Sequence, residues 1–107
     1  MTKPLMKYQK VLNKAFSLFN NGQCWIKNHY RKQNKTTKQM QYCAVGAIDE
    51  AAKRLGCDPK TAIKKLSLAI NSKPNLFWAH SSVVTNYNDT KATFDMIKDV
   101  FKKAARS

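Results

Sequence analysis

Cysteine and histidine are the residue types in this sequence that could bind a metal ion. Structural zinc sites take four such ligands and commonly pair their cysteines about two to four residues apart. The three cysteines here lie much farther apart, and free cysteine is a common core residue. The spacing therefore predicts neither a metal site nor a bound cofactor. The ligands considered are Cys24, His29, Cys43, Cys57 and His80.

A cysteine nucleophile is the second chemistry that these residue types allow. Cys43 stands near the start of an expected helix, where the pKa of a thiol is lowered, and His80 with Asn86 or Asp89 could act as base and orienting group. Cys43 also lies in the uncharged run Tyr42–Ile48, where a small core residue is expected. A Cys43-dependent enzyme is therefore our third hypothesis.

Other catalytic patterns are missing from the sequence. Asp49 and Glu50 are the first carboxylates of the chain, and as neighbours on a helix they would diverge by about 100°. Glycine stands only at positions 22, 46 and 56, too widely spaced for a glycine-rich phosphate loop. The sequence therefore favours a non-enzymatic binding protein.

Positive charge dominates the composition. The 20 lysines and arginines exceed the 6 carboxylates, which gives a net charge of +14, and residues 1–48 contain no carboxylate. Such an excess attracts polyanions, so DNA, RNA or an acidic protein surface is the expected partner. Lysine outnumbers arginine by 17 to 3, which favours phosphate contacts with little sequence specificity. A solvated surface that keeps the protein soluble is the alternative explanation.

The segment of about residues 27–38 is the expected binding arm. It is basic, lacks a clear period and follows the apolar run Cys24–Ile26, which we expect to be extended. Rings interleaved with cations can stack on bases while the charges hold phosphates. A mobile loop without a ligand is the alternative. The predicted contacts here are Trp25, Lys27, His29, Tyr30, Arg31, Lys32, Lys35 and Lys38.

A helix-turn-helix between Ala44 and Ile70 is a further possibility. Its turn would be Gly56–Pro59, and Thr61, Lys64 and Lys65 would face DNA. Any two short helices joined by a glycine turn produce the same pattern. Lys64 and Lys65 are therefore added to the predicted contacts without fixing the motif.

Apolar residues at three- and four-residue spacings predict about four helices. The first covers about residues 4–20 and ends at Asn20–Gly22, and the second covers about residues 38–55, with Thr36 or Thr37 as its N-cap. The third begins at Asp58–Pro59 and ends near residue 71. The last follows Asp89 or Thr90 as its cap.

Before the last helix we expect an extended segment at Val83–Thr85. Inside the second helix we expect a close contact at Gly46. Glycine inside a helix costs up to about 1 kcal/mol relative to alanine, so another backbone or ring should lie against Gly46. The prediction is one mainly α domain over residues 1–107, compatible with a short two-stranded β element pairing residues near Ile26 and Val84.

Several short motifs resemble a small bacterial and phage domain of unknown function. They are Gly22 followed by Trp25, the Cys-x-x-Gly-Ala run from Cys43, the Asn88–Asp89 pair, and the apolar last helix. The family pattern has Trp before Asn-Asp, where this chain has Tyr87. The resemblance implies no activity. It implies that Cys43, Gly46, Asn88 and Asp89 lie close together, with Asn88–Asp89 either capping the last helix and bonding to the Cys43 helix or lining a small polar pocket.

The expected function is a strongly basic, nucleic-acid-binding protein, plausible for a phage. The main alternative is a small modulator that binds an acidic surface of a host protein. No apolar run approaches the about 20 residues of a membrane span, and no apolar signal core follows Met1. An odd number of cysteines suits reduced thiols. We therefore expect a cytoplasmic location without membrane contact, and the sequence predicts no oligomeric state.

Overall fold

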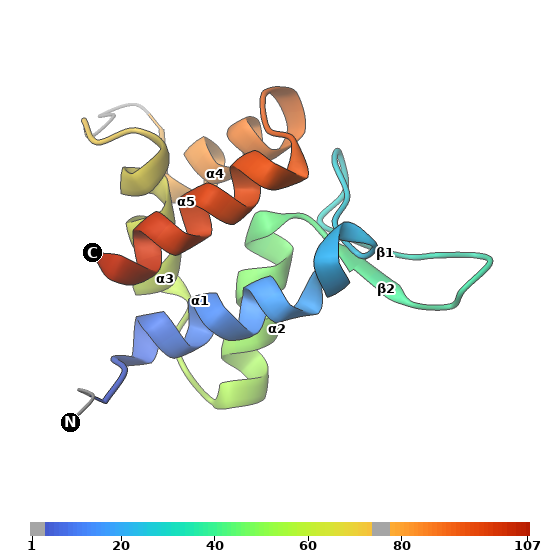
Figure 1. Ribbon diagram of the computed structural model, residues 1–107, viewed down its shortest axis with the longest axis horizontal. Coiled ribbons are helices and arrows are strands. Elements are labelled where there is room, and N and C mark those ends of the chain that lie inside the picture. The colour runs from blue at the N-terminus through green and yellow to red at the C-terminus, as the bar shows by residue number, and fades with distance from the viewer. Residues whose placement is uncertain (1–3, 74–77) are drawn as a thin grey trace.

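The computed structural model describes residues 4–73 and 78–107. In this part of the chain, five α helices and a two-stranded sheet follow one another in sequence (Figure 1). The mainly α class with a short β element is confirmed, with five helices instead of about four. Their bounds are α1 Lys7–Leu18, β1 Arg31–Gln33, β2 Met40–Tyr42, α2 Ala44–Leu55, α3 Lys60–Ile70, α4 His80–Thr90 and α5 Phe94–Arg106, with a 3₁₀ turn, η1, at Asn20–Gly22.

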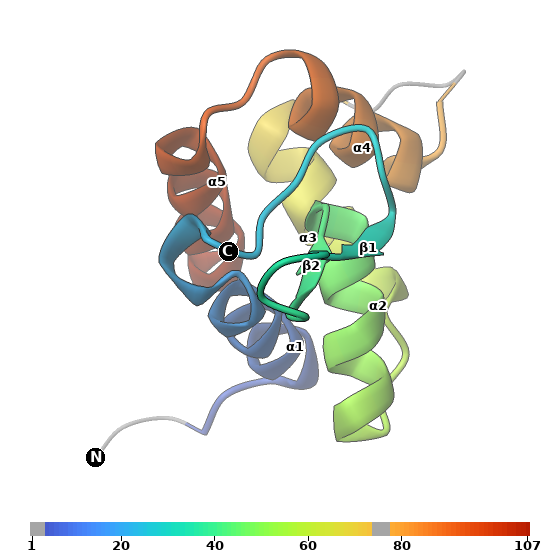
Figure 2. The same cartoon turned by 90° about the vertical axis from the view of Figure 1, so that its right-hand side faces the viewer.

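The helices surround one hydrophobic core, and α1 packs against α2, α3 and α5. Tyr8, Val11, Leu12 and Ala15 form its buried stripe, as the periodicity predicts. Helices α1 and α5 lie side by side (Figures 1 and 2). Gln9 Nε2 on α1 donates a hydrogen bond to the Ala105 carbonyl on α5 at 2.7 Å. The radius of gyration, 13.2 Å, is close to the about 13 Å expected for a compact chain of this length.

An aromatic cluster closes one end of the core where α1 meets α5. Phe16, Phe19, Phe94 and Phe101 pack with ring centroids 5.6–6.0 Å apart, mostly edge to face. Trp25 extends the cluster, since its ring centroid lies 5.9 Å from that of Phe94. Edge-to-face rings add stability beyond the area they bury. Trp25 is therefore a packing residue of this end of the core.

The helix ends follow the predicted turn chemistry in most places. Asn20 and Asn21 adopt positive φ angles of 47° and 56° directly after α1, and Gly56 ends α2 at a φ of 68°. Asp58 accepts a hydrogen bond from the Lys60 amide at 2.9 Å at the start of α3. The predicted turn around Ser72–Asn75 lies partly outside the described residues.

Helix α4 replaces the extended segment that the sequence predicts at Val83–Thr85. Its β-branched run has weak helix propensity, but Val84 and Asn88, one turn apart, are both buried on one face. Burial of that face outweighs the local preference of the β-branched residues for an extended conformation. The predicted cap at Asp89 or Thr90 is wrong for the same reason, because both lie inside α4, and Thr93 Oγ1 caps α5 at 3.3 Å from the Met96 amide.

The β element lies in the segment predicted to be an irregular arm. Strand β1 pairs antiparallel with β2, and Lys32 faces Gln41 across the pair. Pairing between Ile26 and Val84 is wrong, since Val84 is helical and the Ile26 amide bonds the Tyr42 carbonyl at 3.0 Å. The second helix consequently starts at Ala44 instead of about residue 38, with Cys43 rather than Thr36 or Thr37 as its N-cap. No helix in the described ranges is long and apolar enough to cross a membrane.

Candidate nucleic-acid interface

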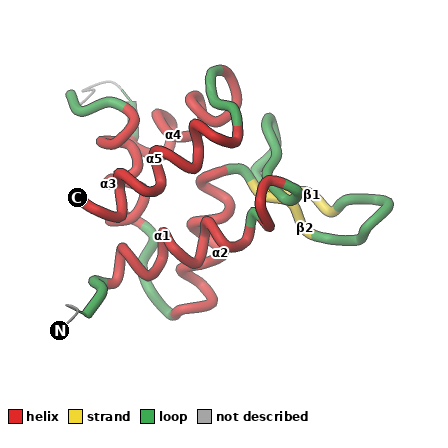
Figure 3. The backbone as a smooth tube through the Cα atoms, viewed as in Figure 1, coloured by secondary structure: helices red, strands yellow, loops and turns green. Residues whose placement is uncertain are grey.

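The β1–β2 hairpin, residues 31–42, projects away from the helical body (Figures 1 and 3). Its tip is closed by backbone bonds from the Asn34 amide to the Gln39 carbonyl at 2.8 Å and from the Lys38 amide to the Asn34 carbonyl at 2.9 Å. The Asn34 side chain accepts from the Thr36 and Thr37 amides at 2.8 and 3.0 Å. The predicted loop is thus a hydrogen-bonded ribbon whose turn is shaped by Asn34.

Four of the predicted cationic side chains lie on this ribbon. Arg31 and Lys32 are exposed on β1, and Lys35 and Lys38 are exposed at the tip. Successive strand residues point to opposite faces, so Arg31 and Lys32 place charge on both faces of the ribbon. The nearest carboxylates in sequence, Asp49 and Glu50, lie on α2. The hairpin itself therefore has positive charge on its faces and tip and no carboxylate.

The predicted rings are less available than their spacing suggests. The Trp25 indole N–H donates to Asn88 Oδ1 at 2.7 Å, and Lys27 Nζ lies 5.6 Å from the centre of the ring. Tyr30 is exposed, but its hydroxyl donates to Asp49 Oδ2. Burial and that carboxylate raise the pKa of Tyr30 above its ordinary value. His29 is exposed on the same stretch.

The base of the hairpin is fixed to the start of α2 at Gly46. A methyl group on Gly46 would overlap the Tyr30 carbonyl oxygen, and the same oxygen accepts from the Cys43 amide at 3.2 Å. The close backbone approach predicted at Gly46 is therefore present, and its partner is the residue directly before β1. This contact sets the direction in which the hairpin leaves the body.

A fully buried Asn88 holds the other side of this junction. Its Oδ1 accepts from the Ala44 amide at 3.1 Å as well as from Trp25, and its Nδ2 donates to the Ile26 carbonyl at 3.0 Å and to Asp89 Oδ1 at 2.9 Å. Asp89 Oδ1 also accepts from the Asn28 amide at 2.9 Å. We call these residues, Trp25, Ile26, Ala44, Asn88 and Asp89, the Asn88 cluster. Each polar atom of the Asn88 side chain is thus satisfied.

Cys43 lies beside this cluster as the N-cap of α2. Its Sγ accepts from the Gly46 amide at 3.4 Å. Burial raises the pKa of the Cys43 thiol, and this outweighs the amide hydrogen bonds that favour the thiolate. The direction is opposite to the lowered pKa expected at a helix start. His80 bonds elsewhere, with Nδ1 3.0 Å from Ser67 Oγ, so Cys43 and His80 do not form the pair considered from the sequence.

Lys64 and Lys65 lie on α3, away from the hairpin. Lys65 Nζ is 5.0 Å from the centre of the Tyr8 ring in the first turn of α1, whereas the hairpin lies beyond the C-terminal end of that helix (Figure 1). Because α1 has 12 residues and therefore spans about 18 Å, Lys65 and the hairpin are separated by roughly the length of this helix. The α2–α3 turn exists at the predicted position, but the two lysines are not brought together with the arm.

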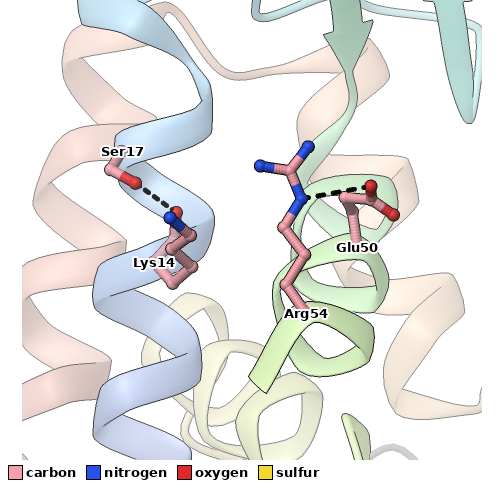
Figure 4. A network of polar contacts seen from close by, with 4 residues as sticks. All are labelled: Lys14, Ser17, Glu50 and Arg54. Atoms are coloured by element: carbon pink, nitrogen blue, oxygen red, sulfur yellow. Dashed lines mark hydrogen bonds and ion pairs between the residues drawn. The ribbon is translucent and has the colours of Figure 1, made fainter. Parts of the chain in front are cut away.

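Ion pairing leaves most of the cations unneutralised. Within residues 4–73 and 78–107, the ion pair formed is Arg54 Nε with Glu50 Oε1 at 3.2 Å, one turn apart on α2 (Figure 4). On the neighbouring α1, Ser17 Oγ donates to the Lys14 carbonyl at 2.6 Å. The carboxylate of Glu50 therefore neutralises Arg54 and none of the cations of the hairpin.

Comparison with known proteins adds one finding. Residues 6–107 match a family described as "Family of unknown function (DUF6197)". The chain belongs to this family. A search among curated proteins found no match, and neither did a search among solved structures.

In this DUF6197 member, the motif residues named from the resemblance are neighbours. From inside α4, Asn88 bonds to the Ala44 amide at the start of α2, and Asp89 bonds to the Asn28 amide, so neither residue caps the last helix. Cys43 and Gly46 share the first turn of α2. The part of the prediction that placed these residues together matches the contacts, and the part that made Asn88–Asp89 the cap of the last helix is wrong.

Sequence reasoning missed a polar depression of about 680 Å³ along α4. Ser82, Thr85, Asn86 and Asp89 follow helical spacing on one exposed face, and Trp78 stands at one end. That spacing is visible in the sequence once residues 80–90 are taken as a helix. The complete lining is Asn28, Trp78, Ala79, Ser81, Ser82, Thr85, Asn86, Asp89 and Thr90.

Proposed function

We propose that this protein binds nucleic acid through phosphate contacts made mainly by the β1–β2 hairpin. The observation that carries the proposal is a projecting ribbon with exposed cations on both faces and at its tip, and with no carboxylate of its own. Lysine contacts to phosphate supply most of the non-specific affinity for nucleic acid. The net charge of +14 adds a long-range attraction that speeds the encounter.

The amide side chains of the hairpin support phosphate contacts over base readout. Gln33 Nε2 donates to the Lys38 carbonyl at 3.0 Å, and Gln41 Nε2 donates to the Gln23 carbonyl at 3.4 Å. Asn34 is occupied by the turn. Since glutamine and asparagine read adenine only with free amide groups, little sequence preference is expected.

The cellular setting that we propose is a reducing bacterial cytoplasm, either of a cell or of a phage-infected host. Cys24, Cys43 and Cys57 form no disulfide in the structure, which suits that compartment. A high content of lysine and asparagine suits an AT-rich genome.

The test is a binding titration with two charge-matched variants. Lys32→Gln with Lys35→Gln removes two exposed cations from the hairpin, and Lys102→Gln with Lys103→Gln removes two exposed cations from the C-terminal part of α5. Both variants lower the net charge equally. Fluorescence anisotropy with labelled random-sequence oligonucleotides at about 50 mM salt would report the dissociation constants.

We expect the hairpin variant to bind about 10- to 100-fold more weakly and to lose about two units from the slope of log K against log salt. The α5 variant should change the affinity by less than about threefold. Equal losses in both variants would reject the hairpin as the site. Absence of binding by the wild-type protein at high micromolar concentration would reject the function. Capture of an acidic protein that survives nuclease treatment would then favour the modulator hypothesis.

A further inference from the structure

We propose that the ligand of the hairpin is double-stranded DNA and that the ribbon enters its major groove. This inference rests on the proposed function and names its substrate class. Single-stranded nucleic acid, duplex RNA and an acidic protein are the competing ligands. The structure distinguishes them by which side chains are free and by the shape of the element that carries them.

Binding of single strands needs aromatic platforms, and the largest ring of this segment, Trp25, is engaged. The Trp25 indole is bonded to Asn88, packed against Phe94 and approached by Lys27. Base stacking on aromatic side chains supplies about 1–3 kcal/mol per base in single-strand binders. Because Trp25 is not free to stack on a base, most of this stacking energy is lost to a single-stranded ligand.

Tyr30 is the exposed ring nearest the ribbon, but its hydroxyl is bonded to Asp49. The depression beside it is lined by two carboxylates, Asp49 and Glu50, and by two cations, Arg31 and Lys53. A nucleotide stacked on Tyr30 would bring its phosphate close to the Asp49 carboxylate at the hydroxyl edge of the ring. That carboxylate makes Tyr30 a poorer stacking platform than a ring surrounded by cations alone.

The ribbon has the form of an element that fits a groove. Its two strands lie about 4.8 Å apart, and the major groove of B-form DNA, about 12 Å wide, admits a two-stranded ribbon with its side chains. All three residues of β1 are exposed, whereas Met40 of β2 packs against the core and Tyr42 is buried, so the accessible part of the ribbon is β1 and the tip.

The placement of the cations matches two rows of phosphate rather than one. Arg31 and Lys32 point to opposite faces of the strand, and Lys35 and Lys38 stand at the tip. A groove is flanked by a phosphate backbone on each side, which offers partners to both faces at once. The major groove of A-form RNA is deep and narrow, so the same ribbon would be excluded from duplex RNA.

The test compares four labelled ligands of one sequence, each about 20 nucleotides long per strand: duplex DNA, each of its single strands, and duplex RNA. Competition with two small dications of similar charge, methyl green in the major groove and netropsin in the minor groove, reports which groove is occupied. The protein is used as the full chain, with the Lys32→Gln and Lys35→Gln variant in parallel.

We expect duplex DNA to bind at least about tenfold more tightly than the other three ligands, methyl green to displace the protein, and netropsin to leave it bound. The hairpin variant should lose most of the preference for duplex DNA. Equal affinity for single strands or duplex RNA, or stronger displacement by netropsin, would overturn the inference while the proposed function stands. Absence of binding to all four ligands would overturn both.

Discussion

The Asn88 cluster and the β1–β2 hairpin use polar side chains in contrasting ways. In the cluster, one buried side chain makes four hydrogen bonds that join α4, the start of α2 and the segment before the hairpin. In the hairpin, exposed cations make no ion pair within the described part of the chain. The comparison separates residues that hold the fold from residues that remain free for a ligand.

The difference also explains why the motif residues and the proposed binding residues are not the same. Asn88, Gly46 and Cys43 are positioned by backbone contacts that tolerate little change. Lys32 and Lys35 contribute charge but little packing, since both are exposed. Substitutions of Asn88, Gly46 and Cys43 should therefore affect stability, and substitutions of the exposed hairpin lysines should affect the proposed binding.

The largest expected effect is that of Asn88→Ala. It leaves the buried Ala44 amide, the Trp25 indole N–H and the Ile26 carbonyl without their partner, which should lower the free energy of unfolding by about 3 kcal/mol. Urea denaturation measures this loss. Asn86→Ala, on an exposed position of the same helix, is the matched control and should change stability by less than about 0.5 kcal/mol. Equal stability of the two variants would contradict the role of the cluster.

Gly46→Ala should have the next largest effect. The added methyl group meets the Tyr30 carbonyl oxygen, which is backbone and cannot turn aside, so a net loss of about 2 kcal/mol is expected despite the better helix propensity of alanine. Gly56→Ala is the control, because nothing lies within 4 Å of its added methyl group and only its φ of 68° opposes the change, at about 1 kcal/mol. If the Gly46 variant proved as stable as the wild type, the hairpin would not be seated on α2 as described.

The smallest effect concerns Cys43 and pH. Because burial raises the pKa of this thiol, the folded state keeps its proton where the unfolded state loses it, so stability falls as pH rises above the unfolded value of about 8.5. Cys43→Ser keeps an acceptor for the Gly46 amide and removes the titration. Between about pH 7.5 and 9.5, the wild type should lose about 1 kcal/mol relative to this variant.

Thiol labelling gives the matching kinetic measurement for Cys43. A raised pKa and burial predict slow reaction with a small alkylating reagent at neutral pH. Rapid labelling of Cys43, together with a pH dependence of the opposite sign, would revive the hypothesis of a cysteine-dependent enzyme.

Periodicity predicted the helices whose apolar stripes face the core. Val11 with Ala15 on α1 and Ile97 with Phe101 on α5 are buried at the expected spacing. Helix α4 could not be predicted in this way, because its buried face consists of Val84 and the polar Asn88 within a β-favouring run. A buried asparagine looks like a turn residue until the partners of its amide are known.

The candidate site was predictable in charge but not in shape. The absence of carboxylates before Asp49 marks the basic region directly from composition. The ribbon escaped prediction because β1 is exposed on both faces and has no alternating apolar pattern. The engagement of Trp25 by Asn88 joins residues far apart in the chain, so the local pattern of rings and cations wrongly suggested a free stacking platform.

The central claim, that the hairpin carries the binding while the Asn88 cluster carries the fold, is tested most directly by nuclear magnetic resonance. Amide chemical shifts of the labelled protein would be followed during titration with the duplex DNA. We predict the largest shift changes within residues 31–42, with small changes on α5 and at Asn88. Largest changes on α5 or along the depression on α4, or changes spread evenly over the surface, would contradict the claim.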